Sequence, residues 1–475
     1  MKSPMRHASL ALAMLTALSL GACATARKAE VALPVAYEAP AAAPAGAIAL
    51  DTWWTAYGDA DLTSLVEQAL ARNPDMRTAR SRLDEVKAQR LSAILQYLPR
   101  GDASYNSRET HTDQIGGTAV SIPGFSNRGT SISQSASFNV SWEVDPFGRG
   151  LFAGRSATAE VDRLRFAYEV TRASIAAQTA DSWFQAKGLA IQLADAQEAA
   201  RIAQDLYGVA DKRARIGIAA ASEADRVAGD LAQAQSQVTA LEAQLQVEKR
   251  ALLILAGRVV EPTTNINATP EVGRPPAVPV ALPSDLLERR PDVRQAQAAV
   301  RSQVNQKILA QLAFFPTYNF MPGLGWQKIK QPGFSSTAET WTLGGTLTQP
   351  ILSIPRLLAD LKTQDARTEQ AVIAYEKAVQ TAFQEAESAL VSLDADRRRV
   401  ALLTDGEARA RRGYEATRIG YDRGFNDLST TLQAQQNWRL IRAQLTAAQV
   451  QALRRSVQAM KAIGGGWPAQ AYAAK

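Results

Sequence analysis

Two very long stretches without proline constrain this chain more than any other feature. Residues 147–261 and 356–467 contain no proline, the residue that most strongly interrupts a helix. Small and apolar residues in both stretches alternate spacings of three and four, a period that winds helices left-handed around a partner. The repeating positions are Ala224, Val227, Leu231, Ala234, Val238, Leu241 and Leu245, and then Val372, Tyr375, Val379, Ala382, Ala386, Ala389 and Leu393. A helix over 151–214 alone would be about 95 Å long, too long for a globular domain. We therefore predict two long helical hairpins, at 149–256 and 355–463.

A sequence motif typical of the start of a helix occurs twice in this chain. "LARNPDMRTAR" begins at Leu70 and "LERRPDVRQAQ" begins at Leu287, with Leu, Arg, Pro, Asp, Arg and Ala shared at matching positions. Proline suits the first helical turn and aspartate complements the positive end of the helix dipole, so the repeat indicates structure rather than chemistry. Each copy precedes a proline corner, "VDPFGR" or "TQPILSIPR". We predict two tandem repeats of short helices, strands, corner and hairpin, covering 59–268 and 269–463.

Segments with a period of two precede each corner, and this period is typical of a sheet with one apolar and one polar face. In the clearest of them, Phe138, Val140 and Trp142 alternate with serine and asparagine. Each segment has about the ten residues that cross a bilayer when tilted. The predicted strands lie near 102–115, 131–144, 317–329 and 338–349, with exposed loops at 110–130 and 330–337.

Four strands cannot close a barrel, and open sheet edges are not tolerated in lipid. A membrane barrel would therefore need strands from other subunits, and three copies would supply twelve. A soluble sandwich or hairpin is the alternative for these segments.

The N-terminus has the form of a lipoprotein signal. Residues 1–22 have a basic start and then an apolar run that is short for a membrane span. They end in Leu-Gly-Ala before Cys23, which resembles the bacterial lipoprotein box. We expect Cys23 to carry acyl chains such as palmitate and to anchor the mature N-terminus. Ala24 after it, rather than aspartate, favours the outer membrane by the same resemblance. An ordinary signal with an incidental cysteine is the alternative. We expect 23–58 to be an acylated tether and 464–475 a flexible tail.

Composition excludes several classes of site. The chain has one Cys and two His, which leaves no material for a Cys/His metal cluster or an internal disulfide. No P-loop, nucleophile elbow or dinucleotide-binding glycine motif occurs. The net charge of +7 falls to +5 without Lys2 and Arg6, which argues against nucleic-acid binding. We expect no cofactor, no metal and no catalysis. An enzyme that uses only carboxylates or serine is the alternative.

The order of these elements resembles the outer membrane factor family, the TolC-like channels that include the NodT-type efflux lipoproteins. The resemblance rests on "WWTAYGDADLTSLVEQALARNPDMRTARSRL" at 53–83, "LLERRPDVRQAQAAV" at 286–300, "VDPFGR", and "RGFNDLSTTLQAQQNW" at 423–438. It covers essentially the whole mature chain.

The resemblance implies a mixed α and β membrane protein. Its homotrimer would form a 12-stranded β-barrel in outer-membrane lipid, continuous with a long periplasmic α-helical barrel. That tunnel would passively conduct drugs or other small molecules from a periplasmic adaptor and an inner-membrane pump, expected to be proton-driven. Two alternatives stay open: a duct for protein secretion, and a lipid-anchored coiled-coil structural protein without a pore.

Each predicted hairpin must turn, and Gly217 and Gly424 are candidate helix C-caps at the turns. The resemblance places these turns at a periplasmic tip where the tunnel narrows and the adaptor docks. Gln433 stands where the family often has an acidic residue, and "GIAAASEAD" departs from the expected first turn. A solvated surface cluster is the alternative to a gate. The aperture candidates are Tyr421, Asp422, Arg423, Asp427, Gln433, Arg213, Arg215 and Asp225.

Overall fold

The computed structural model describes residues 33–38, 49–113, 115–116, 129–218, 220–271, 273–279, 283–423, 425–426 and 428–468. The predicted signal segment, Cys23, Gly424 and Asp427 lie outside these residues. The chain forms two compact units. One comprises Arg90–Ala159 and Ala299–Glu376, and the other comprises Ala32–Gln89, Glu160–Ala298 and Lys377–Lys475.

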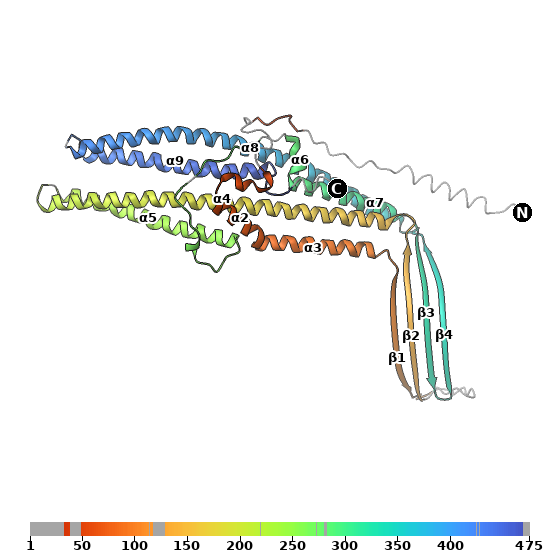
Figure 1. Cartoon of the computed structure of the whole chain (residues 1–475). Helices are drawn as coiled ribbons and strands as arrows, with labels where there is room; N and C mark the ends of the chain where they lie inside the picture. The colour runs from red at the N-terminus through yellow and green to blue at the C-terminus, as the bar shows by residue number, and fades with distance from the viewer. Residues whose placement is uncertain are drawn as a thin grey trace. The chain divides into compact units, whose positions relative to one another are not determined.

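Figure 1 shows the elements in chain order. They are η1 (Leu50–Tyr57), α2 (Ala60–Arg72), α3 (Pro74–Leu95), β1 (Arg100–Thr112), β2 (Gly129–Val144), α4 (Arg149–Arg215), α5 (Ala221–Leu255), η2 (Thr263–Asn265), η3 (Pro283–Asp285), α6 (Leu286–Arg289), α7 (Pro291–Leu312), β3 (Thr317–Gln331), β4 (Phe334–Thr348), α8 (Ile354–Asp422) and α9 (Leu428–Ala462).

The first unit contains one antiparallel sheet in the order β1-β2-β3-β4, so β1 and β4 are its edges. The β2–β3 ladder skips the pairs opposite Met321 and Pro322, because proline has no N–H to donate. A two-residue turn, Pro332 and Gly333, joins β3 to β4, and Gly333 has a φ of 82°.

Both loop predictions were too long, because pairing of the strands continues further than their side-chain pattern indicates. β1 and β2 pair up to Thr112 and Gly129, which narrows the loop expected at 110–130. β3 and β4 pair up to Gln331 and Phe334, so most of 330–337 is strand.

The second unit is helical, with a core of small residues where the long helices pack. Ala176 and Ala180 of α4, Ala382 and Ala386 of α8, and Ala459 of α9 are completely buried. Most heptad positions of α8 are buried, whereas Leu231, Ala234 and Val238 of α5 are only half-buried. No helix within the described ranges has both the length and the apolar character of a membrane span.

Asp59 joins the short helix α2 to the long helix α4. Its Oδ1 accepts the Leu62 N–H at 3.0 Å and so caps α2, while its Oδ2 accepts from Trp183 Nε1 at 2.9 Å and Lys187 Nζ at 3.0 Å. Burial alone would raise the pKa of Asp59, but these hydrogen bonds outweigh it and hold the pKa below its ordinary value.

Two segments expected to be extended or flexible are packed instead, because each carries tryptophan that buries a large apolar area. Residues 50–57 form η1, with Trp53 and Trp54 buried, so the tether is shorter than expected. Trp467 is buried edge-on to Phe166 and donates from Nε1 to the Arg289 carbonyl at 2.7 Å, so the tail is ordered to that point.

Candidate functional site

The turn from α4 to α5 ends in a left-handed glycine. Gly217 has a φ of 76°, and the Ile218 N–H donates to the Arg213 carbonyl at 3.1 Å. This pattern satisfies carbonyls at the end of α4 that would otherwise lack partners. Behind the turn, Ala210 and Ala224 pack with Val227 and close the two helices together.

The turn from α8 to α9 is closed by an asparagine that the sequence patterns did not single out. Asn426 Nδ2 donates to the Thr417 carbonyl at 3.1 Å, and its N–H donates to the Gly420 carbonyl at 3.2 Å. A Cβ at Gly420 would overlap the Asn426 side chain, so a larger residue there would displace Asn426 from its contact with Thr417. Tyr421 and Asp422 end α8, and their side chains lie outside the described set.

The structure does not bring the other aperture candidates together within one chain. Arg215 pairs at 2.9 Å with Asp211 of its own helix and is 77% exposed. Arg213, Asp225, Arg423 and Gln433 are all exposed, and within the described ranges none of them forms an ion pair with the opposite turn. Any contact among them would therefore need a different arrangement or another copy of the chain.

Both turns present apolar side chains to solvent. Ile216 and Ile218 are 63% and 64% exposed at the first turn, and Phe425 is 83% exposed at the second. These side chains are accessible to a binding partner at both turns.

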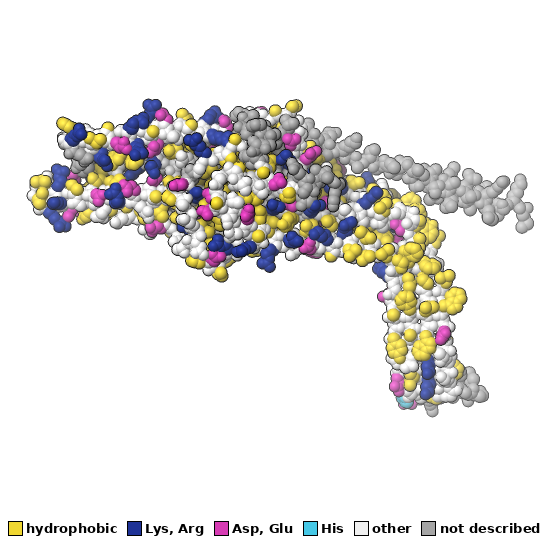
Figure 2. Space-filling model, viewed as in Figure 1, with side chains coloured by type: hydrophobic (Ala, Val, Ile, Leu, Met, Phe, Trp, Pro, Cys, Tyr) yellow, Lys and Arg dark blue, Asp and Glu magenta, His cyan; other side chains and the backbone are white. Residues whose placement is uncertain are grey.

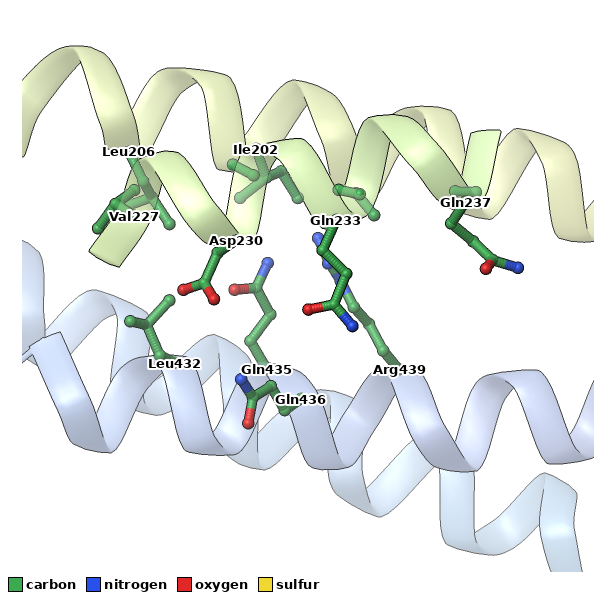
Figure 3. A pocket seen from close by; sticks show the side chains of 14 residues that line it. Ile202, Leu206, Val227, Asp230, Gln233, Gln237, Leu432, Gln435, Gln436 and Arg439 are labelled. Carbon is green, nitrogen blue, oxygen red and sulfur yellow. The ribbon is translucent and has the colours of Figure 1, made fainter. Parts of the chain in front are cut away.

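A cavity of about 340 Å³ lies between the α4/α5 hairpin and α9 (Figure 3). Asp230 of α5 and Gln435 of α9 point toward one another across it. Gln435 is only 6% exposed, and its Nε2 has no hydrogen-bond partner among the described residues. The lining residues are Ala196, Ala199, Ile202, Ala203, Leu206, Val227, Asp230, Gln233, Ala234, Gln237, Leu432, Gln435, Gln436 and Arg439.

The helix α9 is held firmly on its other sides. Arg442 pairs with Asp195 of α4 at 2.8 Å. Arg454 makes a bidentate contact to Asp181 of α4 at 2.8 and 2.9 Å. Toward α8, Trp438 stacks on Tyr414 with ring centroids 5.3 Å apart.

The cavity is lined by α4, α5 and α9, so these three helices do not pack completely against one another at this level. Burial lowers the pKa of Arg439 at the edge of the cavity, although a guanidinium stays charged. The sequence analysis did not identify the polar side chains Asp230 and Gln435 at this cavity. The one available indication was that Gln435 lies four residues after Thr431, on the face of α9 that is buried.

A model of the outer membrane efflux protein family matches residues 65–258 and 282–465. The pyoverdine export outer membrane protein OpmQ of Pseudomonas aeruginosa is 28% identical over 471 residues, covering 95% of each chain. Outer membrane protein OprJ of the same organism is 27% identical, covering 96% of this chain and 95% of OprJ.

Solved structures share the fold. The Campylobacter jejuni CmeC outer membrane channel matches with a TM-score of 0.80 and 21% identity, covering 94% of this chain and 95% of that chain. The open state of the Neisseria gonorrhoeae MtrE outer membrane channel also has a TM-score of 0.80 and 21% identity, and the match covers 93% of this chain and 97% of that chain. Since the family model spans most of the sequence, this chain belongs to the outer membrane efflux protein family, whose members are passive channels of the outer membrane and not enzymes.

Proposed function

We propose that this chain is the outer-membrane channel subunit of a tripartite efflux system. Three copies would close a 12-stranded barrel, and their long helices would continue it as a periplasmic tunnel. The main support for this proposal is the four-stranded sheet. One of its faces is apolar, and among the described residues no further strand pairs with its edges, β1 and β4. Such a sheet is stable in lipid only when further strands pair with its edges.

The polar face of the sheet supports a water-filled interior. Ser104 of β1 and Ser137 of β2 share a hydrogen bond at 2.9 Å. Gly325 of β3 and Thr340 of β4 lie next to them in the same row across the sheet. The named relatives include a pyoverdine exporter, which favours small molecules as cargo over proteins. The exposed apolar turns of the hairpins fit docking of a periplasmic adaptor that connects to an inner-membrane pump. A coiled-coil protein without a pore would not account for a sheet with one apolar and one polar face.

The lipid anchor at Cys23 is part of this proposal. It rests on the signal-like segment that ends at Cys23. Within the expected tether, residues 33–38 lie against α8. Tyr37 stacks on Phe383 with centroids 5.8 Å apart, and the Glu38 N–H donates to Glu387 Oε1 at 3.0 Å. Burial, together with the nearby Glu387 carboxylate, raises the pKa of Tyr37 to about 12.

The purified protein is expected to form pores in planar bilayers, and deletion of its gene should raise susceptibility to exported compounds several-fold. The adaptor should co-purify with the wild type.

The lipid anchor is tested in the same strains. A palmitate analogue should label the wild type and not the Cys23→Ser variant. Absence of any pore would refute the channel, while labelling of the variant would refute only the anchor.

The gate assignment has its own test. Replacing Tyr421 and Asp422 together with alanine should raise single-channel conductance several-fold, because polar contacts between neighbouring helices would no longer hold the aperture narrow. A matched control replaces Asp405 and Arg409, which pair at 2.8 Å on an exposed stretch of the same helix. Equal conductance in wild type and the double variant would remove these residues from the gate.

A further inference from the structure

The apolar face of the sheet ends in two lysines. On β3, the side chains of this face run from Tyr318 through Leu324 and Trp326 to Lys328 and Lys330. The span from Tyr318 to Trp326 is about 27 Å along the strand at 3.4 Å per residue, which is about 21 Å along the membrane normal when a strand is tilted by about 40°. That length is comparable to the apolar band of about 25 Å on outer-membrane barrels. The two lysines therefore stand immediately beyond a band of membrane thickness.

Figure 2 shows basic side chains on this face, between the apolar side chains and the end of the sheet where the strands turn. The register places Lys328 beside Gln134 and Thr337, and Lys330 beside Ile132 and Ser335. Amide and hydroxyl groups of these neighbours can donate hydrogen bonds to the same anion as the lysines.

Both lysines are available to bind an anion. Both are exposed, and neither forms an ion pair with a residue that the structure describes. Two acids share the face. Glu339 lies diagonally from Lys328 on β4, and Glu109 lies two strands away from Lys330, or about 10 Å at the spacing between strands. At the other end of the sheet, Arg149 pairs with Glu143 at 3.2 Å and donates to the carbonyls of Leu312 and Phe315.

We propose that Lys328 and Lys330 bind the phosphorylated headgroup of an anionic glycolipid in the outer leaflet. This inference rests on the proposed function, because it requires the strand turns to face outward and the helices to lie in the periplasm. Free cations that follow an apolar band on the lipid side, next to hydrogen-bond donors, match a phosphate at the membrane boundary.

The test compares three full-length purified proteins: the wild type, Lys328→Gln with Lys330→Gln, and Arg108→Gln. Arg108 is the matched control, because it pairs with Ser133 opposite Ile329 and so lies at the same height on the opposite, polar face. Affinity for lipid A is measured in mixed detergent micelles, with lipid A lacking its phosphates as the second arm. Each protein is also tested for pores in planar bilayers.

We expect the lysine variant to bind lipid A about 25-fold more weakly, at roughly fivefold for each lysine near an anionic surface. Arg108→Gln should bind as the wild type does, and added salt should narrow the difference. Removal of the phosphates should weaken wild-type binding to the level of the lysine variant.

Three outcomes would overturn the inference: equal affinity in the lysine variant, equal loss in Arg108→Gln, or no effect of removing the phosphates. If the proteins still form pores in those cases, the channel proposal stands and only the lipid site fails. If no protein forms a pore, the channel proposal itself fails.

Discussion

Replacing Arg290 with alanine is expected to lower the free energy of unfolding of the helical unit by about 2–3 kcal/mol, the value of hydrogen bonds to a charged group. Arg290 is only 7% exposed and directly precedes α7. It contacts Asp292 Oδ2 at 2.5 Å and Glu385 Oε2 of α8 at 2.7 Å. It also donates to the Ala462 carbonyl at the end of α9, at 3.2 Å. One guanidinium thus joins three helices. Its loss would leave the Ala462 carbonyl without this donor and remove the contacts to Asp292 and Glu385, whose side chains are 36% and 54% exposed.

The measurement is the urea midpoint of helical circular dichroism for the purified protein in detergent. Arg398→Ala is the matched control, because Arg398 is 73% exposed and pairs with Asp394 of its own helix. Such an exposed pair is worth ~0–1 kcal/mol. Arg290→Lys keeps the positive charge but loses the planar guanidinium, so its urea midpoint should lie between those of the two alanine variants. A midpoint for Arg290→Ala equal to that of Arg398→Ala would show that the charged cluster adds no net stability.

The long helices could be predicted from the sequence because their determinants are local. A missing proline and a repeating spacing act within a few turns, so the expected hairpins at 149–256 and 355–463 lie close to the observed α4–α5 and α8–α9. Strand ends were harder to predict. β1 is exposed along its whole length and has no apolar stripe, so its register depends on β2 rather than on its own residues.

Contacts between distant segments could not be predicted. The burial of Trp467 depends on Phe166 and Arg289, and the closure of the second turn depends on Asn426 reaching Thr417. The cavity at Gln435 exists only because α4, α5 and α9 meet there. A spacing rule within one helix contains no information about which helix packs against it.

Leu343→Arg should be the most damaging single change on the sheet, and it tests whether the apolar face meets lipid. Leu343 is 67% exposed and pairs with Pro322, near the middle of the apolar band. An arginine facing lipid at the bilayer midplane costs about 2–4 kcal/mol. A closed homotrimer would bear that cost in every subunit. We expect the heat-modifiable oligomer to be lost when the variant is refolded into vesicles.

The neighbouring residue supplies the control. Thr342 alternates to the polar face, where it pairs with Gly323, so Thr342→Arg should place its charge in a water-filled interior and leave the oligomer intact. On a soluble sheet, by contrast, an arginine at the exposed Leu343 would be harmless, since surface substitutions usually change stability by less than about 0.5 kcal/mol. Equal tolerance of both variants would therefore exclude a lipid-facing sheet. Loss in Thr342→Arg alone would mean that the polar face, not the apolar one, is packed against protein.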